Sequence, residues 1–142
     1  MKSDKIVPRH LVLLFCVTIA ACGHKTPEQK LLDTIDPADS WIATLQLTGE
    51  KWLANSVPTR FVRSTVDAAK KDFEKVGKAL DQSDAPGPMI LAVRHQLEVA
   101  TAAAGDVSQA VQKNDRRTVE MSVRRFAAAH AALQQLQNQK SR

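Results

Sequence analysis

Histidine is the side chain in this sequence that is best suited to bind a metal ion or a haem iron. Of the four histidines, His130 is the one that falls in a row of apolar residues, four positions after Phe126, within a predicted helix. A histidine inside a helical bundle can ligate haem together with a methionine, and Met89 or Met121 could supply that second ligand. The simpler interpretation is that His130 lies at the edge of the apolar row and bonds to water or to a backbone carbonyl. We therefore predict no bound cofactor or metal, with a haem or metal site at His130 as the alternative.

The other residues that could take part in chemistry are isolated. His95 falls off the apolar row of its predicted helix, and His24 alone makes no metal site. The chain has no Cys-x-x-Cys-His for covalent haem, no Glu-x-x-His pair for a di-metal site and no Gly-x-Ser-x-Gly nucleophile motif. A glycine-rich phosphate loop is missing as well. We predict that the protein is not an enzyme.

The thiol of Cys22 is the remaining reactive group, and the residues before it give it a role. Lys2, Lys5 and Arg9 make the first ten residues basic, and an apolar run of 11 residues follows, 11–21. A basic segment, a short apolar segment and small residues before a cleavage point are typical of a secretory signal peptide. The run is too short for a membrane-spanning helix, which needs roughly 20 residues. We expect residues 1–21 to be removed as a signal peptide.

The residues Ile19-Ala20-Ala21-Cys22 resemble the lipobox of bacterial lipoproteins, an aliphatic residue and two small residues before a cysteine. The resemblance implies that the Cys22 thiol carries a diacylglyceryl group and that Cys22 becomes the first residue of the mature chain. The alternative is an ordinary signal peptide in which Cys22 has no role. In enteric bacteria an Asp after this cysteine retains a lipoprotein in the inner membrane. Gly23 stands there instead, so the resemblance favours an anchor in the outer membrane, facing the periplasm.

The resemblance covers residues 1–23, and the mature chain resembles no family that we recognise. Removal of residues 1–21 from the 142-residue chain would leave 121 residues, enough for one domain. Cys16 would leave with the signal peptide and Cys22 would be acylated, so we expect no free thiol and no disulfide. Three basic residues and one acidic residue would also leave, which lowers the net charge from +5 to +3. That charge gives no reason to expect a nucleic-acid partner.

Apolar residues at helical spacing predict an all-α fold. A short tether and helix are expected in 22–35, followed by helices over about 36–55, 58–82, 89–113 and 115–137, with a polar tail at 138–142. The helix over 58–82 has apolar residues at steps of four and three without interruption, as in a heptad repeat. The same steps recur over 89–113. Gly49, inside the first of these helices, indicates either a close approach of a neighbouring backbone or a bend.

Short connections favour packing of consecutive helices as antiparallel neighbours. We therefore predict an antiparallel, up-down four-helix bundle over residues 36–137. The helix over 36–55 is the shortest and least regular of the four. A three-helix bundle with this helix packed across it is the alternative.

Two sets of residues are candidates for an interaction surface. Trp41 and Trp52 belong to the core in the simpler interpretation, whereas an exposed indole could anchor a partner or lie at the membrane surface. Arg116, Arg117, Arg124 and Arg125 form a basic patch on the last predicted helix. Such a patch is either a solvated face or a contact for an acidic partner or for anionic lipid headgroups.

Taken together, these patterns predict a lipid-anchored, periplasmic helical bundle that acts as a non-catalytic interaction module of the cell envelope. Its expected partners are the membrane, through the anchor, and an envelope protein. The alternative is a bundle that binds a small ligand or cofactor. In that case the small side chains of Ala100 and Ala104 would leave room for a pocket, and His130 would be its polar group.

Overall fold

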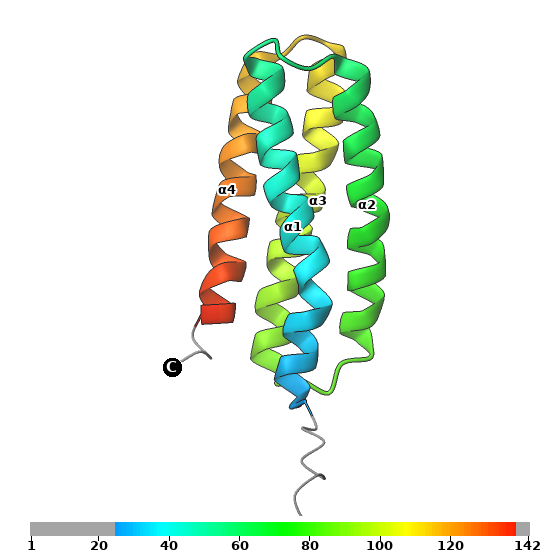
Figure 1. Ribbon diagram of the computed structural model, residues 1–142, viewed down its shortest axis with the longest axis vertical. Helices are drawn as coiled ribbons and strands as arrows, with labels where there is room; N and C mark the ends of the chain where they lie inside the picture. The colour runs from blue at the N-terminus through cyan, green and yellow to red at the C-terminus, as the bar shows by residue number, and fades with distance from the viewer. Residues whose placement is uncertain (1–24, 139–142) are drawn as a thin grey trace, which may run out of the picture.

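The computed structural model describes residues 25–138 as a bundle of four helices (Figure 1). The helices are α1 (Pro27–Leu53), α2 (Thr59–Asp81), α3 (Gly87–Gln112) and α4 (Arg116–Asn138). No strand occurs between residues 25 and 138. The prediction of an all-α helical bundle is confirmed.

Each helix of the bundle packs against the next one along the chain, and α4 packs against α1. Figure 1 shows the α1–α2 and α3–α4 connections together at one end of the bundle. The start of α1, the α2–α3 connection and the end of α4 lie together at the other end, which we call the N-terminal end. Because α1 lies alongside its neighbours over its length, the three-helix alternative does not describe this structure.

The short helix expected within 22–35 and the helix expected from residue 36 are one continuous helix, α1. Thr26 and Gln29 form a reciprocal cap, in which each side chain accepts a hydrogen bond from the other residue's backbone N–H, at 3.2 and 2.9 Å. The predicted helix start at Asp36 is wrong, because α1 continues through Pro37. Leu31 and Ile35 lie in the core on the same side as Ile42. Their burial outweighs the helix-breaking tendency of the proline.

The predicted core rows of the two middle helices are confirmed. In α2 all six expected positions are buried, namely Val62, Val66, Ala69, Phe73, Val76 and Leu80. In α3 the expected row is buried except for Ile90, which is half-buried at the first turn. Its buried members are Val93, Leu97, Ala100, Ala104, Val107 and Val111. Ala100, Ala103 and Ala104 have no exposed surface at all. The small residues of α3 are therefore packed against their neighbours.

Two asparagines end the helices at the end opposite the N-terminal end. Asn55 and Asn114 have φ angles of 57° and 55°, in the left-handed region that asparagine tolerates better than most residues. The following N–H groups return to carbonyls near the helix ends, Ser56 to Lys51 at 2.8 Å and Asp115 to Ala110 at 2.9 Å. This is the Schellman arrangement, which satisfies carbonyls that a helix end would leave unpaired.

The fourth helix presents a slightly different side to the core from the one predicted by its sequence spacing, which is the row Val119, Val123, Phe126, His130 and Leu133. Ser122 and Ala129 are buried, while their neighbours Val123 and His130 are half-buried. Gly49 of α1 lies against this side of α4, and a Cβ atom at Gly49 would be 2.6 Å from Cγ2 of Val123. Of the two roles considered for Gly49, the structure supports the close approach of α1 and α4.

Candidate functional site

The predicted lipidation site, Cys22, lies outside the described residues. The described chain starts at Lys25, and α1 begins two residues later. The tail at 138–142 lies outside them as well, apart from Asn138 at the end of α4. The candidate sites that the structure does describe are the histidines, the tryptophans, the arginines and the surface grooves.

His130 has a carboxylate partner that the sequence did not indicate. Its Nδ1 atom lies 2.7 Å from Oδ1 of Asp39, which joins α4 to α1. The Asp39 side chain is 11% exposed and the His130 side chain 31%. The pair is an ion pair when the imidazole is protonated and a hydrogen bond when it is neutral. The predicted edge position of His130 is confirmed, but its partner is a carboxylate instead of water or a backbone carbonyl.

The methionines considered as haem ligands do not surround His130. Met121 is 49% exposed and precedes His130 by nine residues on the same helix, about 13 Å along its axis. Met89 packs against the core from the first turn of α3. His95 is exposed, as predicted. Among residues 25–138 no group of three or more His, Cys, Asp or Glu side chains is placed to hold a metal ion.

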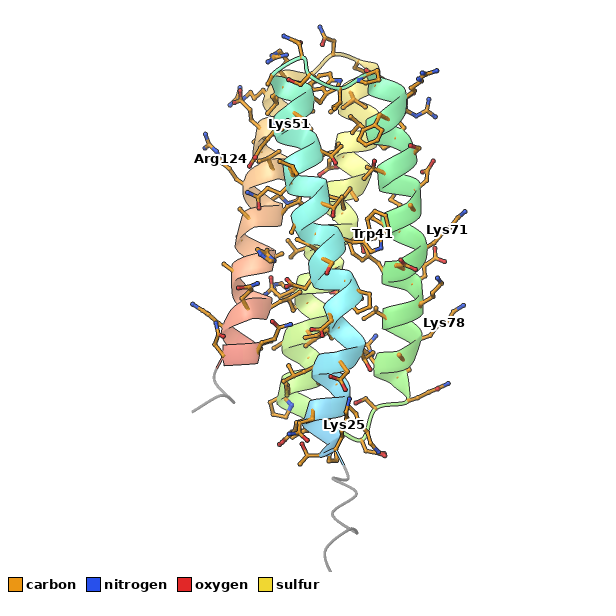
Figure 2. All side chains as sticks on the ribbon, viewed as in Figure 1. Lys25, Trp41, Lys51, Lys71, Lys78 and Arg124 are labelled. Atoms are coloured by element: carbon orange, nitrogen blue, oxygen red, sulfur yellow. The ribbon has the colours of Figure 1, made fainter. Side chains whose placement is uncertain are left out.

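Trp41 is half-buried between α1 and α2, where its indole is bound by a carboxylate (Figure 2). Nε1 of Trp41 donates to Oδ2 of Asp72 at 2.6 Å, and Nζ of Lys75 donates to Oδ1 of the same carboxylate at 2.7 Å. The hydrogen bond from Lys75, followed by that from Trp41, holds the pKa of the Asp72 carboxyl below its usual value. Trp41 thus ties the first helix to the second.

Trp52 belongs to the core, in agreement with the simpler interpretation of its role. It is 6% exposed, and its Nε1 donates to Oγ1 of Thr59 at 3.1 Å across the α1–α2 connection. The guanidinium of Arg116 lies over the indole, 5.8 Å from the ring centroid. Arg116 also donates to the carbonyl of Leu53 and, at 3.5 Å, to Oδ1 of Asn55. A cation at the carboxyl end of α1 is favourably placed with respect to the helix dipole.

The four arginines of the predicted basic patch differ in their surroundings. Arg116 is engaged with the end of α1, and Arg125 donates to Oδ2 of Asp106 at 2.6 Å. Arg117 and Arg124 are both exposed. The backbone N–H and the charge of Arg117 act on the Asp115 carboxylate, whereas the Arg124 side chain forms no hydrogen bond or ion pair with another side chain of residues 25–138. Figure 2 shows Arg124 pointing away from the bundle. Arg116 and Arg125 therefore have structural roles, Arg117 interacts with the Asp115 carboxylate, and the side chain of Arg124 is available to a partner.

One groove lies between α2 and α3, and His130 is not among the residues that line it. It has a volume of about 420 Å³ and is lined by Gly77, Arg94, Leu97, Glu98, Thr101 and Ala102. Arg94 is bound on its rim by Asp81, at 2.7 Å. Ala100 and Ala104 are buried in the core row of α3, whereas His130 lies on α4 with Asp39. These three residues do not meet around this groove.

Two carboxylates were missed as site residues. Asp39 lies four positions after Ile35 and three before Ile42, so it stands within the apolar row of α1. An acidic residue in such a row is the signal that could have identified it, because a charge is rarely buried without a partner. Asp72 carries no comparable signal, since it stands among other charged residues of α2.

No helix in the described part of the chain is both long and apolar enough to cross a membrane. Comparison of the whole chain with models of protein families, with curated proteins and with solved structures finds no match.

Proposed function

We propose that the protein is a bacterial lipoprotein, anchored through Cys22 in the outer membrane and facing the periplasm. In this proposal its up-down, antiparallel bundle serves as a non-catalytic module that binds another envelope protein. The single observation that carries the proposal is the sequence Ile19-Ala20-Ala21-Cys22, which comes after a basic and an apolar segment and immediately before the helical body. Both the location and the anchoring follow from that motif.

The short distance along the chain between Cys22 and α1 gives the proposal a geometric consequence. Pro27 comes five positions after Cys22, and five residues span at most about 18 Å. An acyl group on Cys22 would therefore hold the N-terminal end of the bundle close to the bilayer. The 27 residues of α1 are about 40 Å long, so the opposite end would stand well away from the lipid.

The surroundings of the polar core residues support a non-catalytic role. Asp39 and His130 join α1 to α4, and Asp72 joins α2 to the Trp41 indole of α1. The Thr59 hydroxyl oxygen accepts a hydrogen bond from the indole N–H of Trp52. Asp72 and Lys75 also line a groove of about 400 Å³ with Thr34, Pro37, Val76 and Ala79, but the Asp72 carboxylate is bound to the Lys75 ammonium group and to the Trp41 indole. The arrangement stabilises a rigid body whose surface is left to bind a partner.

Metabolic labelling with palmitate tests the anchor, and the chain contains its own matched control. Wild type and Cys16→Ala should both incorporate the label and sediment with membranes, because Cys16 leaves with the signal peptide. Cys22→Ala should incorporate none, because the thioether cannot form. Two or more acyl chains make such an anchor stable, whereas one chain binds only marginally. Wild-type protein that is unlabelled and freely soluble would contradict the proposal.

A further inference from the structure

The charges of the bundle are distributed unevenly along its length. At the end opposite the N-terminal end, residues 50–64 and 112–124 contain seven basic and three acidic residues. We call this the basic end. At the N-terminal end, residues 25–36, 78–91 and 131–138 contain three basic and five acidic residues. Figure 2 shows Lys51 and Arg124 toward this basic end.

Two arginines of the basic end, Arg60 and Arg63, have side chains with no partner in the fold of residues 25–138. α2 has no acidic residue in its first turn, where Arg60 is the second residue, and Arg63 lies one turn further on; α4 begins with Arg116 and Arg117. The amino end of a helix is its positive end, so a cation there is unfavourable by about 0.3–1 kcal/mol. Arg116 is explained by its bonds to the end of α1. Arg60 and Arg63 are exposed, and their side chains form no hydrogen bond or ion pair with any of residues 25–138.

An exposed aromatic ring accompanies these arginines. Phe61 stands between Arg60 and Arg63 in the sequence and is 49% exposed, one of four large apolar side chains on the described surface with comparable or greater exposure. Arginine and aromatic residues are enriched in the centres of protein interfaces. Positions that break a local rule of stability without an internal gain are expected to serve function.

We infer that the basic end, centred on Arg60, Phe61 and Arg63, is the surface that binds the protein partner, and that the partner presents an acidic segment to it. Charge complementarity would both attract and orient such a segment. Anionic lipid headgroups of the anchoring membrane are disfavoured, because the anchor at Cys22 would hold the opposite, acidic end toward that membrane. This inference rests on the proposed function, whose partner it specifies.

Photocrosslinking in intact cells tests the inference with the full-length protein. Phe61 is replaced by p-benzoyl-phenylalanine, and Leu91, which is 67% exposed at the N-terminal end, carries the same probe as the matched control. Irradiation should give one discrete protein adduct from position 61 and not from position 91. Mass spectrometry of the adduct should find the crosslink in a segment rich in Asp and Glu. Palmitate incorporation is measured in the same cells.

Charge reversal gives the decisive comparison. Arg60→Glu/Arg63→Glu should reduce the adduct by at least about tenfold, because like charges then face each other. Lys30→Glu/Lys78→Glu, at the N-terminal end, should leave it unchanged. The first variant should melt no lower than wild type, since acids suit a helix start. This separates lost binding from lost folding.

Three results would overturn the inference: an adduct with phospholipid, an adduct that survives the reversal at positions 60 and 63, or no adduct from a protein that carries the palmitate label. Absence of the label would instead refute the proposed anchoring. A charge-dependent protein adduct without the label would support the binding surface while the anchor fails.

Discussion

The contact between Asp39 and His130 is the residue-scale feature that most constrains the fold. It is a polar contact in an otherwise apolar row, and it joins residues 91 positions apart in the sequence. The Asp39 side chain is 11% exposed, so loss of its partner would leave a largely buried carboxylate without its hydrogen-bond donor. Such groups are costly, and this gives the pair a role in fixing how α1 and α4 align.

Removal of His130 should therefore destabilise the protein. We expect His130→Ala to lower the free energy of unfolding by about 1–3 kcal/mol, the typical cost of an unsatisfied buried polar group. His95→Ala, on an exposed histidine, should change it by no more than about 0.5 kcal/mol. Urea unfolding of both variants provides the measurement. In the double variant Asp39→Ala/His130→Ala, the loss of unfolding free energy should be smaller than the sum of the two single losses. Additive losses would show that the contact does not form, and so would equal losses for His130→Ala and His95→Ala.

Asp72 should make stability depend on pH in the acid range. The hydrogen bonds from Lys75 and Trp41 lower its pKa in the folded state, so its carboxylate contributes stability above the ordinary Asp pKa. That contribution is lost as the pH falls through the lower, folded-state pKa. The difference in unfolding free energy between wild type and Asp72→Asn should therefore be largest near neutral pH and shrink in acid.

The matched control for this prediction is Asp67→Asn. Asp67 is exposed on the same helix and binds none of the side chains of residues 25–138. Unfolding measured over a pH series should give a smaller and flatter difference for this variant. If the loss of unfolding free energy depended on pH in the same way for both substitutions, the hydrogen bonds from Trp41 and Lys75 would not stabilise the Asp72 carboxylate.

At the scale of elements, the approach of α1 to α4 depends on the missing side chain at Gly49. An added Cβ would be 2.6 Å from Cγ2 of Val123, whose β-branched side chain has little freedom to move. At Gly77 the nearest atom would be Cδ2 of Leu97, at an ordinary 4.0 Å. Substitution by alanine would therefore be crowded at Gly49 and uncrowded at Gly77.

Gly49→Ala should destabilise the bundle by about 1–3 kcal/mol through overpacking, despite the better helix propensity of alanine. Gly77→Ala should stabilise it by up to about 1 kcal/mol, because only the propensity changes. Thermal unfolding followed by circular dichroism compares the two. Gly49→Ala/Val123→Ala should recover part of the loss. If Gly49→Ala were as stabilising as Gly77→Ala, the close approach of α1 and α4 would be refuted.

Pro37 is the other element-scale irregularity, because it lies within the continuous helix α1. Pro37→Ala supplies an N–H group for the carbonyl of Asp33 and should stabilise the protein by up to about 3 kcal/mol. Pro27→Ala is the control, because Pro27 occupies the first helical position, where a proline is favourable. Pro27→Ala should not increase the free energy of unfolding measured with denaturant. Equal effects at the two sites would indicate a helix break near residue 36.

The sequence predicts individual helices better than their contacts. The uninterrupted steps in α2 and α3 identify their core rows, and Pro58 and Pro86 stand immediately before those helices. Asp36-Pro37 misleads, because its local preference for a helix start is outweighed by the burial of Leu31 and Ile35. In α4 two neighbouring rows share the same spacing, and only the packing of Gly49 against Val123 decides between them. Asp39 and His130 could be paired only once that packing was known.

At the scale of the whole molecule, the proposed anchor gives the uneven charge a direction. The bundle has an acidic end that begins at α1 and a basic end that carries Arg60, Phe61 and Arg63. If Cys22 is acylated, the acidic end lies toward the bilayer and the basic end toward the periplasmic space. The sequence suggested a basic patch on α4, but it did not group these arginines with those of α2. That grouping depends on which connections share an end of the bundle.

The most direct test of this account is the intact mass of the protein extracted from cell membranes in detergent. The account predicts a chain that starts at Cys22, runs to Arg142 and carries the added mass of the acyl groups on its first residue. A chain that retains residues 1–21, begins after Cys22 or carries no lipid would contradict the account, and with it the orientation proposed for the bundle.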